Sequence, residues 1–228
     1  MHGAELLWIA GGYLAGTIPS TLIVAKAKHS TELIASSGRG AGETDPHILM
    51  TKHLGVGWTA LAATVDVLKG FMFVLAARRW GDLNASWLSL VGVAVVVGHA
   101  FPFYARQMAG RGLAATAGVY LVLLPVEMVV AGLLIVAGGA ARSTGLATTV
   151  AMALVPVIAA IQGQPGAFVA MSLAIFAILM IRRLEGVGTV IRQGVRPGHA
   201  ILYRCVFDSS GPPPPARRWR AGEEAPPR

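Results

Sequence analysis

A short basic loop between two apolar segments holds the residues of this chain best suited to bind an anion. It lies in the stretch Gly98 to Gly118, GHAFPFYARQMAGRGLAATAG, and carries Arg106 and Arg111. Gly110 and Gly112 flank Arg111, so an anion can approach the backbone while the guanidinium binds it through two parallel hydrogen bonds. The next helix is expected to begin here and to add its free N–H groups. The spacing therefore predicts a phosphate site.

A second loop of suitable chemistry runs from Ser36 to Pro46 with the sequence SSGRGAGETDP. Its closely spaced glycines allow tight turns, so hydroxyl and amide donors can face an oxyanion. A plain connector has the same composition, and both interpretations stay open, although the loop is expected on the same membrane side as Arg111. If it is a phosphate cradle, the residues expected to bind there are Ser37, Gly38, Arg39 and Lys52.

Four ionisable side chains fall within or at the edge of apolar segments, where a charge is costly and usually faces the protein interior. Asp66 and Lys69 are three residues apart, so they share a helix face and are expected to form a buried pair, with Lys69 also a candidate phosphate ligand. His99 is a candidate proton-transfer group or hydrogen-bond anchor, and we assign it a supporting role. Glu127 follows Pro125 and is expected at the outer membrane boundary.

The elements that position these residues are apolar helices. Of 228 residues, 54% are hydrophobic and 13% are charged, whereas soluble domains carry about a quarter charged residues. The mean hydropathy is +0.62. Most apolar runs are close to the ~20 residues that cross a membrane. These runs cover 4–25, 55–77, 85–105, 112–140, 146–161 and 165–181.

The distribution of charge predicts the topology. Lys26 and Lys28 follow the first run, which has no signal-peptide features, so the N-terminus is expected outside. Leu124-Pro125 divides the run 112–140, because a proline in a helix interior removes a hydrogen bond and clashes with the preceding turn. We therefore expect an all-α polytopic membrane protein of about seven transmembrane helices with a cytosolic C-terminus. Only Arg78 and Arg79 then lie on the outer side, against the positive-inside rule.

Composition also limits the partners and the domain organisation. The net charge of +8 is spread over loops beside apolar helices, which favours membrane lipids and phosphate over nucleic acid. The single Cys205 excludes an intramolecular disulfide, and no Cys/His spacing indicates a metal or a cofactor. We expect a membrane domain over 1–190, a cytosolic segment over 191–208 and a disordered basic, proline-rich tail over 209–228.

Three ordered motifs between about residues 11 and 190 resemble those of the bacterial acyl-phosphate:glycerol-3-phosphate acyltransferases. GTIPS at 16–20 is similar to that family's Gly-Ser-Ile-Pro-Ser, and DVLKG at 66–70 to its Asp-x-x-Lys-Gly. The Gly98 to Gly118 stretch resembles its Gly-His-x-Phe-Pro…Gly-Gly-Lys-Gly-x-Ala-Thr signature, with Arg111 at the lysine position. A further motif is matched at Arg183-Leu184, while Ala177 and Met180 replace its His and Asn.

The resemblance implies an enzyme of the bacterial inner membrane that transfers a fatty acyl group from acyl phosphate to glycerol 3-phosphate and forms lysophosphatidate. Acyl phosphate is already activated, so the protein mainly has to position two phosphate-bearing substrates. The implied substrate-binding residues are Ser37, Gly38, Arg39, Lys52, Lys69, Gly110, Arg111, Gly112 and Arg183.

Two other functions stay open at this point. The replacement of the His and Asn by Ala177 and Met180 is consistent with a diverged paralogue that binds an anionic lipid or another phosphorylated acceptor. A small membrane transporter is the second alternative, although transporters often contain paired repeats with broken helices in corresponding positions. Only one such break, at Pro125, is evident in this sequence.

Overall fold

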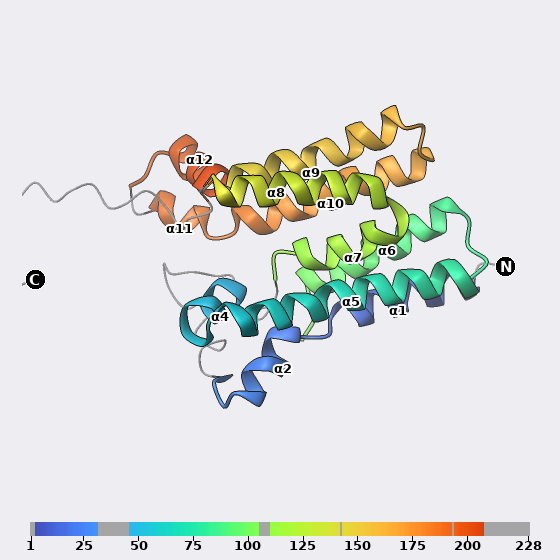
Figure 1. Cartoon of the computed structure of the whole chain (residues 1–228), viewed down its shortest axis with the longest axis horizontal. Helices are drawn as coiled ribbons and strands as arrows, with labels where there is room; N and C mark the ends of the chain where they lie inside the picture. Colours follow the sequence, from blue (N-terminus) through green and yellow to red (C-terminus); the bar gives the residue numbers. More distant parts are fainter. Residues whose placement is uncertain (1–2, 32–45, 105–109, 142, 193, 208–228) are drawn as a thin grey trace, which may run out of the picture.

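The computed structural model describes residues 3–31, 46–104, 110–141, 143–192 and 194–207, and this part of the chain consists of helices joined by turns. The helices are labelled in Figure 1. Their bounds are α1 (Gly3–Gly16), α2 (Ser20–Ala27), α4 (Pro46–Leu54), α5 (Val56–Trp80), α6 (Ala85–Ala100), α7 (Leu113–Leu123), α8 (Pro125–Ala140), α9 (Thr144–Ile161), α10 (Gly166–Leu184), α11 (Val187–Arg192) and α12 (Pro197–Phe207).

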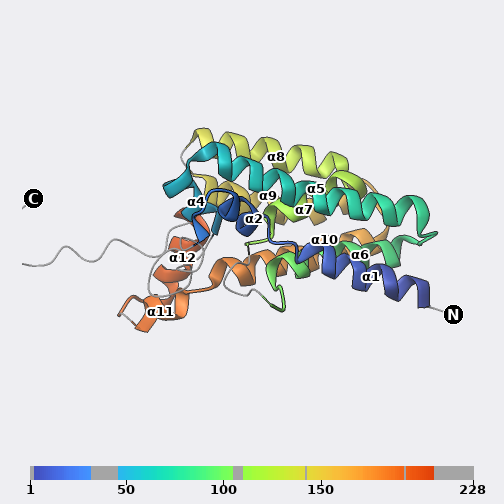
Figure 2. The same ribbon diagram turned by 90° about the horizontal axis from the view of Figure 1, so that it is seen from below.

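Within these residues, four helical segments are long and apolar enough to cross a membrane, which confirms the predicted all-helical membrane chain. They are Gly3–Ala27, Val56–Trp80, Thr144–Ile161 and Gly166–Leu184. The three shorter apolar helices α6, α7 and α8 lie beside them. The long helices follow one common direction, and α2, α4, α11 and α12 gather at the end of the molecule opposite the N-terminus (Figures 1 and 2).

Two prolines divide apolar runs. The predicted break at Pro125 is confirmed: α7 ends at Leu123, and Pro125 is the first residue of α8, a position where its missing N–H costs nothing. The first apolar run, expected as one helix, is also divided, since α1 ends at Gly16 and α2 begins after Pro19. Proline disfavours a helical residue before it. This second break forms the turn that carries the GTIPS motif.

Glycines bring the helices around these breaks into close contact. A Cβ atom on Gly16 of α1 would overlap the carbonyl oxygen of Val95 in α6, and one on Gly118 of α7 would overlap that of Val67 in α5. Small residues at helix crossings let backbones approach closely in membrane proteins. The first contact joins α1 to α6 and the second joins α5 to α7, and residues from these helices line the candidate site.

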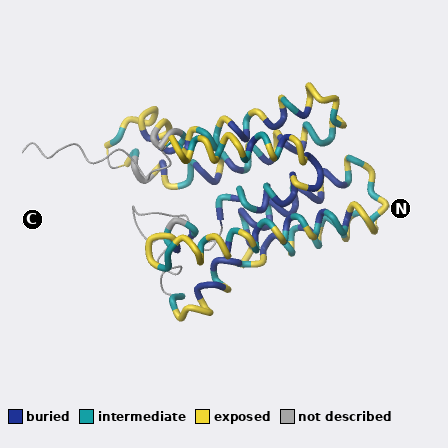
Figure 3. Tube along the Cα trace, in the orientation of Figure 1, coloured by how far each residue is buried: buried dark blue, intermediate teal, exposed yellow. Residues whose placement is uncertain are grey.

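The main core lies on the inward faces of the helices, as the dark segments of Figure 3 show. Its largest fully buried side chains include Tyr120, Leu124, Met152 and Ile175. Glu127 is also fully buried, so its carboxyl group lies inside the bundle, while its expected depth at the outer membrane boundary stays a prediction. It is buried because α8 packs along α9 immediately after Pro125. The carboxyl group lies in the first turn of α8, where the positive end of the helix dipole stabilises an acidic side chain.

The C-terminal part of the described chain packs on the bundle. The predicted domain boundary at residue 190 falls inside α11, and α12 contacts α9 and α10. The proline-rich tail 209–228 lies outside the described residues.

Candidate functional site

A cavity of about 210 Å³ opens beside the N-terminus of α7. It lies between residues of α4, α5 and α6 and the glycine-flanked arginine that the sequence indicated. The lining residues are His47, Thr59, Ala63, His99, Arg111, Gly112, Leu113 and Ala114.

The backbone at the N-terminus of α7 offers N–H groups that can bind an anion in the cavity. Gly112 has a φ of 95° and forms the N-cap of α7, a left-handed conformation that glycine adopts without strain. The first N–H groups of a helix have no partner within it and carry partial positive charge. Gly112, Leu113 and Ala114, which supply those groups, all line the cavity with Arg111. The geometry therefore combines a guanidinium with a helix N-terminus.

A buried cluster of charged and polar side chains borders the same cavity through His47 and His99. Asp66 is fully buried, and Lys69 Nζ lies 2.7 Å from its Oδ1, so the predicted ion pair exists. His47 Nε2 lies 3.1 Å from the second carboxylate oxygen, and His99 Nδ1 lies 3.3 Å from the first. Lys69 Nζ is also 2.9 Å from His99 Nδ1. One carboxylate thus fixes side chains from α4, α5 and α6.

The turn between α1 and α2 is tied to the same cluster. Lys69 Nζ donates to the carbonyl oxygen of Ile18 at 2.8 Å, and Tyr104 Oη donates to that of Thr17 at 2.6 Å. A second, narrow cavity lies here, lined by residues 16–21 together with His47, His99, Pro102 and Gly110. His47 and His99 border both cavities. The GTIPS turn is therefore part of the site.

Gly110 connects the arginine loop to this cluster. A Cβ atom at Gly110 would overlap Nε2 of His99, so only glycine allows the loop to lie against the imidazole. The carbonyl oxygen of Gly110 accepts a hydrogen bond from Arg182 Nε at 3.3 Å. Arg182 also pairs with Glu185 and lies over the ring of Phe101, at 5.4 Å from its centroid. These contacts hold the loop on both sides.

The predicted site residues divide into three groups. Lys69, His99 and the segment 110–112 come together in the structure. Lys52 is exposed on α4 and is not among the described residues that line the cavity. Arg183 lies elsewhere: it donates to the carbonyl oxygen of Arg204 at 3.1 Å and to the hydroxyl of Thr149 at 3.0 Å. The predicted ligands outside the described residues are Ser37, Gly38 and Arg39.

Sequence reasoning missed two contributors. His47 comes directly after the glycine-rich loop, and no spacing in the sequence relates it to Asp66 on the next helix. Arg182 was passed over in favour of its neighbour Arg183, which matched a motif. Adjacent residues of a helix project about 100° apart, so the two arginines face different neighbours, but the helical period does not say which neighbour each of them meets.

No group of three or more His, Cys, Asp or Glu side chains in the described ranges is arranged to hold a metal ion. The carboxylate of Asp66 is instead surrounded by nitrogen atoms of Lys69, His47 and His99. The polar chemistry that this site offers is hydrogen bonding and positive charge.

The comparisons with known proteins agree with this chemistry. A family model described as glycerol-3-phosphate acyltransferase matches residues 6–193. The chain is 30% identical over 192 residues to the glycerol-3-phosphate acyltransferase of Geobacter sulfurreducens, covering 83% of this chain and 95% of the relative. It is 27% identical over 185 residues to that of Geotalea daltonii, covering 81% and 92%.

Solved structures show the same fold. The chain superimposes with a TM-score of 0.69 and 24% identity on PlsY (YgiH), an integral membrane glycerol 3-phosphate acyltransferase, over 85% of this chain and 95% of that one. PlsY was solved in a glycerol 3-phosphate form and in a lysophosphatidic acid form. Together the matches define a membrane acyltransferase of phospholipid synthesis. Within that class, the chain belongs to the glycerol-3-phosphate acyltransferase family.

Proposed function

We propose that this enzyme transfers a fatty acyl group from acyl phosphate to glycerol 3-phosphate, forming lysophosphatidate and inorganic phosphate. The observation that carries the proposal is the cavity in which Arg111 lies beside the N-terminus of α7. Glycerol 3-phosphate is the acceptor because the relatives bear its name and PlsY was solved with it. We infer acyl phosphate as the donor because the Gly98 to Gly118 stretch resembles the signature of the acyl-phosphate-dependent acyltransferases.

Phosphate binding follows from the charges at the cavity. An anion at the end of α7 receives hydrogen bonds from the first N–H groups of the helix and a bidentate contact from Arg111. A cavity of about 210 Å³ is small, so the rest of an acyl donor has to extend out of it. We place the chain of the donor along the apolar surfaces of the neighbouring helices, among them the exposed Leu61 of α5.

The reaction needs no nucleophilic side chain. A hydroxyl oxygen of the acceptor attacks the carbonyl carbon of the donor, and the bond from that carbon to the bridging oxygen breaks. The proton of the hydroxyl ends on the inorganic phosphate that leaves. Donors aimed at the developing oxyanion typically contribute 10²–10³-fold in rate. Holding both substrates in one orientation contributes further. The protein supplies orientation and positive charge.

The Asp66 cluster keeps these groups in position. Lys69 is held by Asp66 at 2.7 Å and by the carbonyl oxygen of Ile18 at 2.8 Å. His99 is held through Nδ1 and covered at Nε2 by Gly110. His99 therefore supports the loop at Gly110, and Lys69 supports the turn at Ile18. We retain the supporting role of His99. Arg183 is left out because its guanidinium bonds to Arg204 and Thr149.

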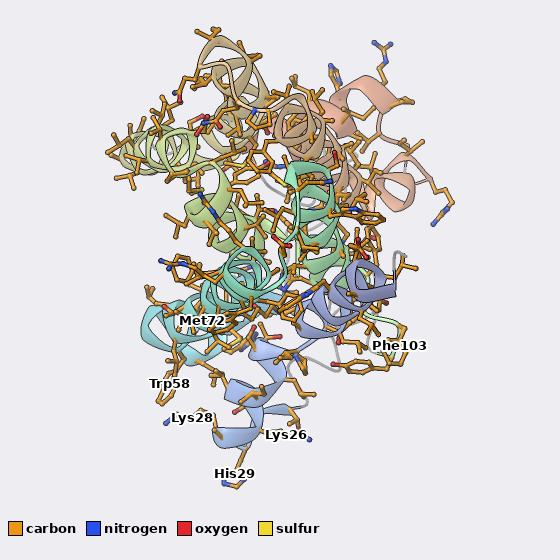
Figure 4. The ribbon with its side chains drawn as sticks, turned by 90° about the vertical axis from the view of Figure 1, so that its right-hand side faces the viewer. Lys26, Lys28, His29, Trp58, Met72 and Phe103 are labelled. Carbon is orange, nitrogen blue, oxygen red and sulfur yellow. The ribbon has the colours of Figure 1, made fainter. Side chains whose placement is uncertain are left out.

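The membrane arrangement is part of the proposal. The four long apolar segments and the three shorter helices α6, α7 and α8 form seven crossings or partial crossings. The cavity end then faces the cytosol, with the N-terminus outside and the C-terminus inside, in the inner membrane of a bacterium. Lys26 near the end of α2, and Lys28 and His29 just after it, project away from the bundle (Figure 4). Because α2 lies at the end of the molecule opposite the N-terminus (Figure 1), this agrees with the positive-inside rule.

One assay tests the reaction. Purified full-length chain in liposomes, given acyl phosphate and glycerol 3-phosphate, should release inorganic phosphate and form a monoacylated product in equal amounts. Ser37→Ala in the same assay tests the predicted ligand in the first loop. Binding of glycerol 3-phosphate without turnover would contradict the proposal and support the diverged paralogue. Accumulation of unmodified substrate inside sealed vesicles would support the transporter.

A further inference from the structure

Arg78 and Arg79 are not explained by acyl transfer. They lie in the last turn of α5, at the end of the molecule toward which the N-terminus points (Figure 1). At 1.5 Å per residue they are about 14 Å beyond Lys69 along the helix. In the topology that the charges predict, they are the exceptions to the positive-inside rule. Two cations in such a position call for a separate physical reason.

The structure gives such a reason for Arg78. Its Nη1 donates to the carbonyl oxygen of Val122 at 2.6 Å. Val122 lies in the last turn of α7, whose 11 residues span about 16 Å, roughly half of a ~30 Å hydrocarbon core. The final carbonyls of a helix that ends inside a membrane need partners. Arg78 is therefore fixed by a backbone group at the break before Pro125.

A cavity of about 370 Å³ lies beside this contact. It is larger than the cavity at the N-terminus of α7, and it combines two arginines with apolar walls from α5 and α7. The lining residues are Phe71, Leu75, Arg78, Arg79, Leu121 and Val122.

The residues around this cavity beside Arg78 are of the kinds found at a membrane surface. Met72 of α5 is 59% exposed and Leu121 of α7 is 40% exposed, so the apolar walls continue onto the outer face of the bundle. Trp80, next to Arg79, is 80% exposed, and tryptophan is enriched at the level of the lipid headgroups. Arg79 is also exposed. Charged and apolar surface therefore lie next to each other, which matches the charged headgroup and the apolar chains of a phospholipid.

We propose that this cavity is a binding site for a phospholipid with an anionic headgroup. The phosphate lies against the guanidinium of Arg79 and the charge of Arg78, and one acyl chain lies across Phe71, Leu75 and Leu121. Bidentate contact with phosphate is characteristic of arginine. A free phosphate ion would leave the apolar walls unused, which is why the occupant is a lipid. The site does not depend on the acyl-transfer reaction.

Native mass spectrometry of the full chain in detergent, with phosphatidylglycerol or phosphatidylcholine added, tests the proposal. The informative variant is Arg79→Gln, because it removes a charge without touching the hydrogen bond from Arg78 to Val122. Arg196→Gln is the matched control, since Arg196 is exposed just before α12. A basic residue at a lipid surface contributes about a fivefold preference for anionic lipid.

Wild type and Arg196→Gln should retain phosphatidylglycerol over phosphatidylcholine, and Arg79→Gln should lose about fivefold of that preference while keeping its unfolding temperature. The proposal fails if Arg79→Gln retains phosphatidylglycerol as wild type does, or if both lipids are retained equally by wild type. It also fails if an excess of inorganic phosphate displaces the lipid, because the site would then recognise an anion without the acyl chain.

Discussion

Two polar regions of this molecule contain buried charges and use them differently. Around Asp66, side chains from three helices meet at one carboxylate, and the cluster borders a cavity with a helix N-terminus. Around Arg183, the guanidinium bonds to the carbonyl oxygen of Arg204 and the hydroxyl of Thr149, groups that belong to neighbouring helices. The first arrangement can receive an anion, and the second holds α9, α10 and α12 together.

Arg182 and Arg183 are neighbours in the chain, yet they belong to different regions. They are adjacent in α10 and both are buried. Arg182 contacts Gly110, in the loop that carries Arg111, and Arg183 contacts Arg204 of α12. Their partners, rather than their charge or their burial, distinguish a residue that supports the site from one that supports the packing of helices.

The largest expected effect is at Arg111. Arg111→Ala should lower kcat/KM for glycerol 3-phosphate by about 10²–10³-fold, because a charge-assisted contact to the phosphate is lost. Arg111→Lys keeps the charge without the bidentate geometry and should recover most of that activity. Arg196→Ala is the control and should leave kcat/KM within about twofold. Phosphate release measures all three, and an active Arg111→Ala enzyme would refute the site.

Asp66→Asn should give the next largest effect. Removal of one partner of a buried ion pair costs about 3–5 kcal/mol, because Lys69 is left buried without its counter-charge. The double variant Asp66→Leu with Lys69→Met removes both charges and should regain much of the stability without the activity. Unfolding in detergent and phosphate release measure the two quantities. If the double variant turned over substrate normally, the cluster would be structural only.

Gly110→Ala should have a smaller effect, at the contact between the loop and His99. The added Cβ overlaps Nε2 of His99, and overpacking of this kind costs about 1–3 kcal/mol. Activity should fall by about tenfold as the loop shifts. Gly132→Ala in α8 is the matched control: its nearest neighbour would be Met128 Cε at 4.0 Å. Helix propensity should make that variant neutral or more stable by up to about 1 kcal/mol.

The smallest effects are expected for alanine variants of the two arginines of α10, which can be compared directly. Arg182→Ala should raise the KM for glycerol 3-phosphate about fivefold, because Gly110 loses one of its contacts, worth about 1 kcal/mol. Arg183→Ala should instead lower stability by about 1–3 kcal/mol and leave KM within about twofold. Initial rates and thermal unfolding separate the two cases. If Arg183→Ala raised the KM and Arg182→Ala only lowered stability, the division between the Asp66 region and the Arg183 region would be wrong.

Much of the fold could be predicted from the sequence because length and hydropathy dominate in a membrane. The break at Pro125 and the pairing of Asp66 with Lys69 both follow from rules that act within one helix. The N-terminus of α7 at Gly112 was also predictable, since a glycine precedes a new apolar run. Each of these features depends on residues close together in the chain.

The rest depends on contacts between helices. His47 reaches Asp66 only because α4 packs on α5, and Glu127 is buried only because α8 packs along α9. The break at Pro19 was missed, although the same proline rule that identified the break at Pro125 applies to it. Periodicity identifies the face on which a side chain lies, but not the helix that it meets, so the choice between Arg182 and Arg183 required the structure.

The central claim is that glycerol 3-phosphate binds at the cavity beside the N-terminus of α7. Equilibrium binding of radiolabelled glycerol 3-phosphate to purified wild type, Arg111→Ala and Arg183→Lys, without an acyl donor, tests this most directly. We predict that binding is at least tenfold weaker in Arg111→Ala and unchanged within about twofold in Arg183→Lys. Equal affinity of wild type and Arg111→Ala would contradict the account.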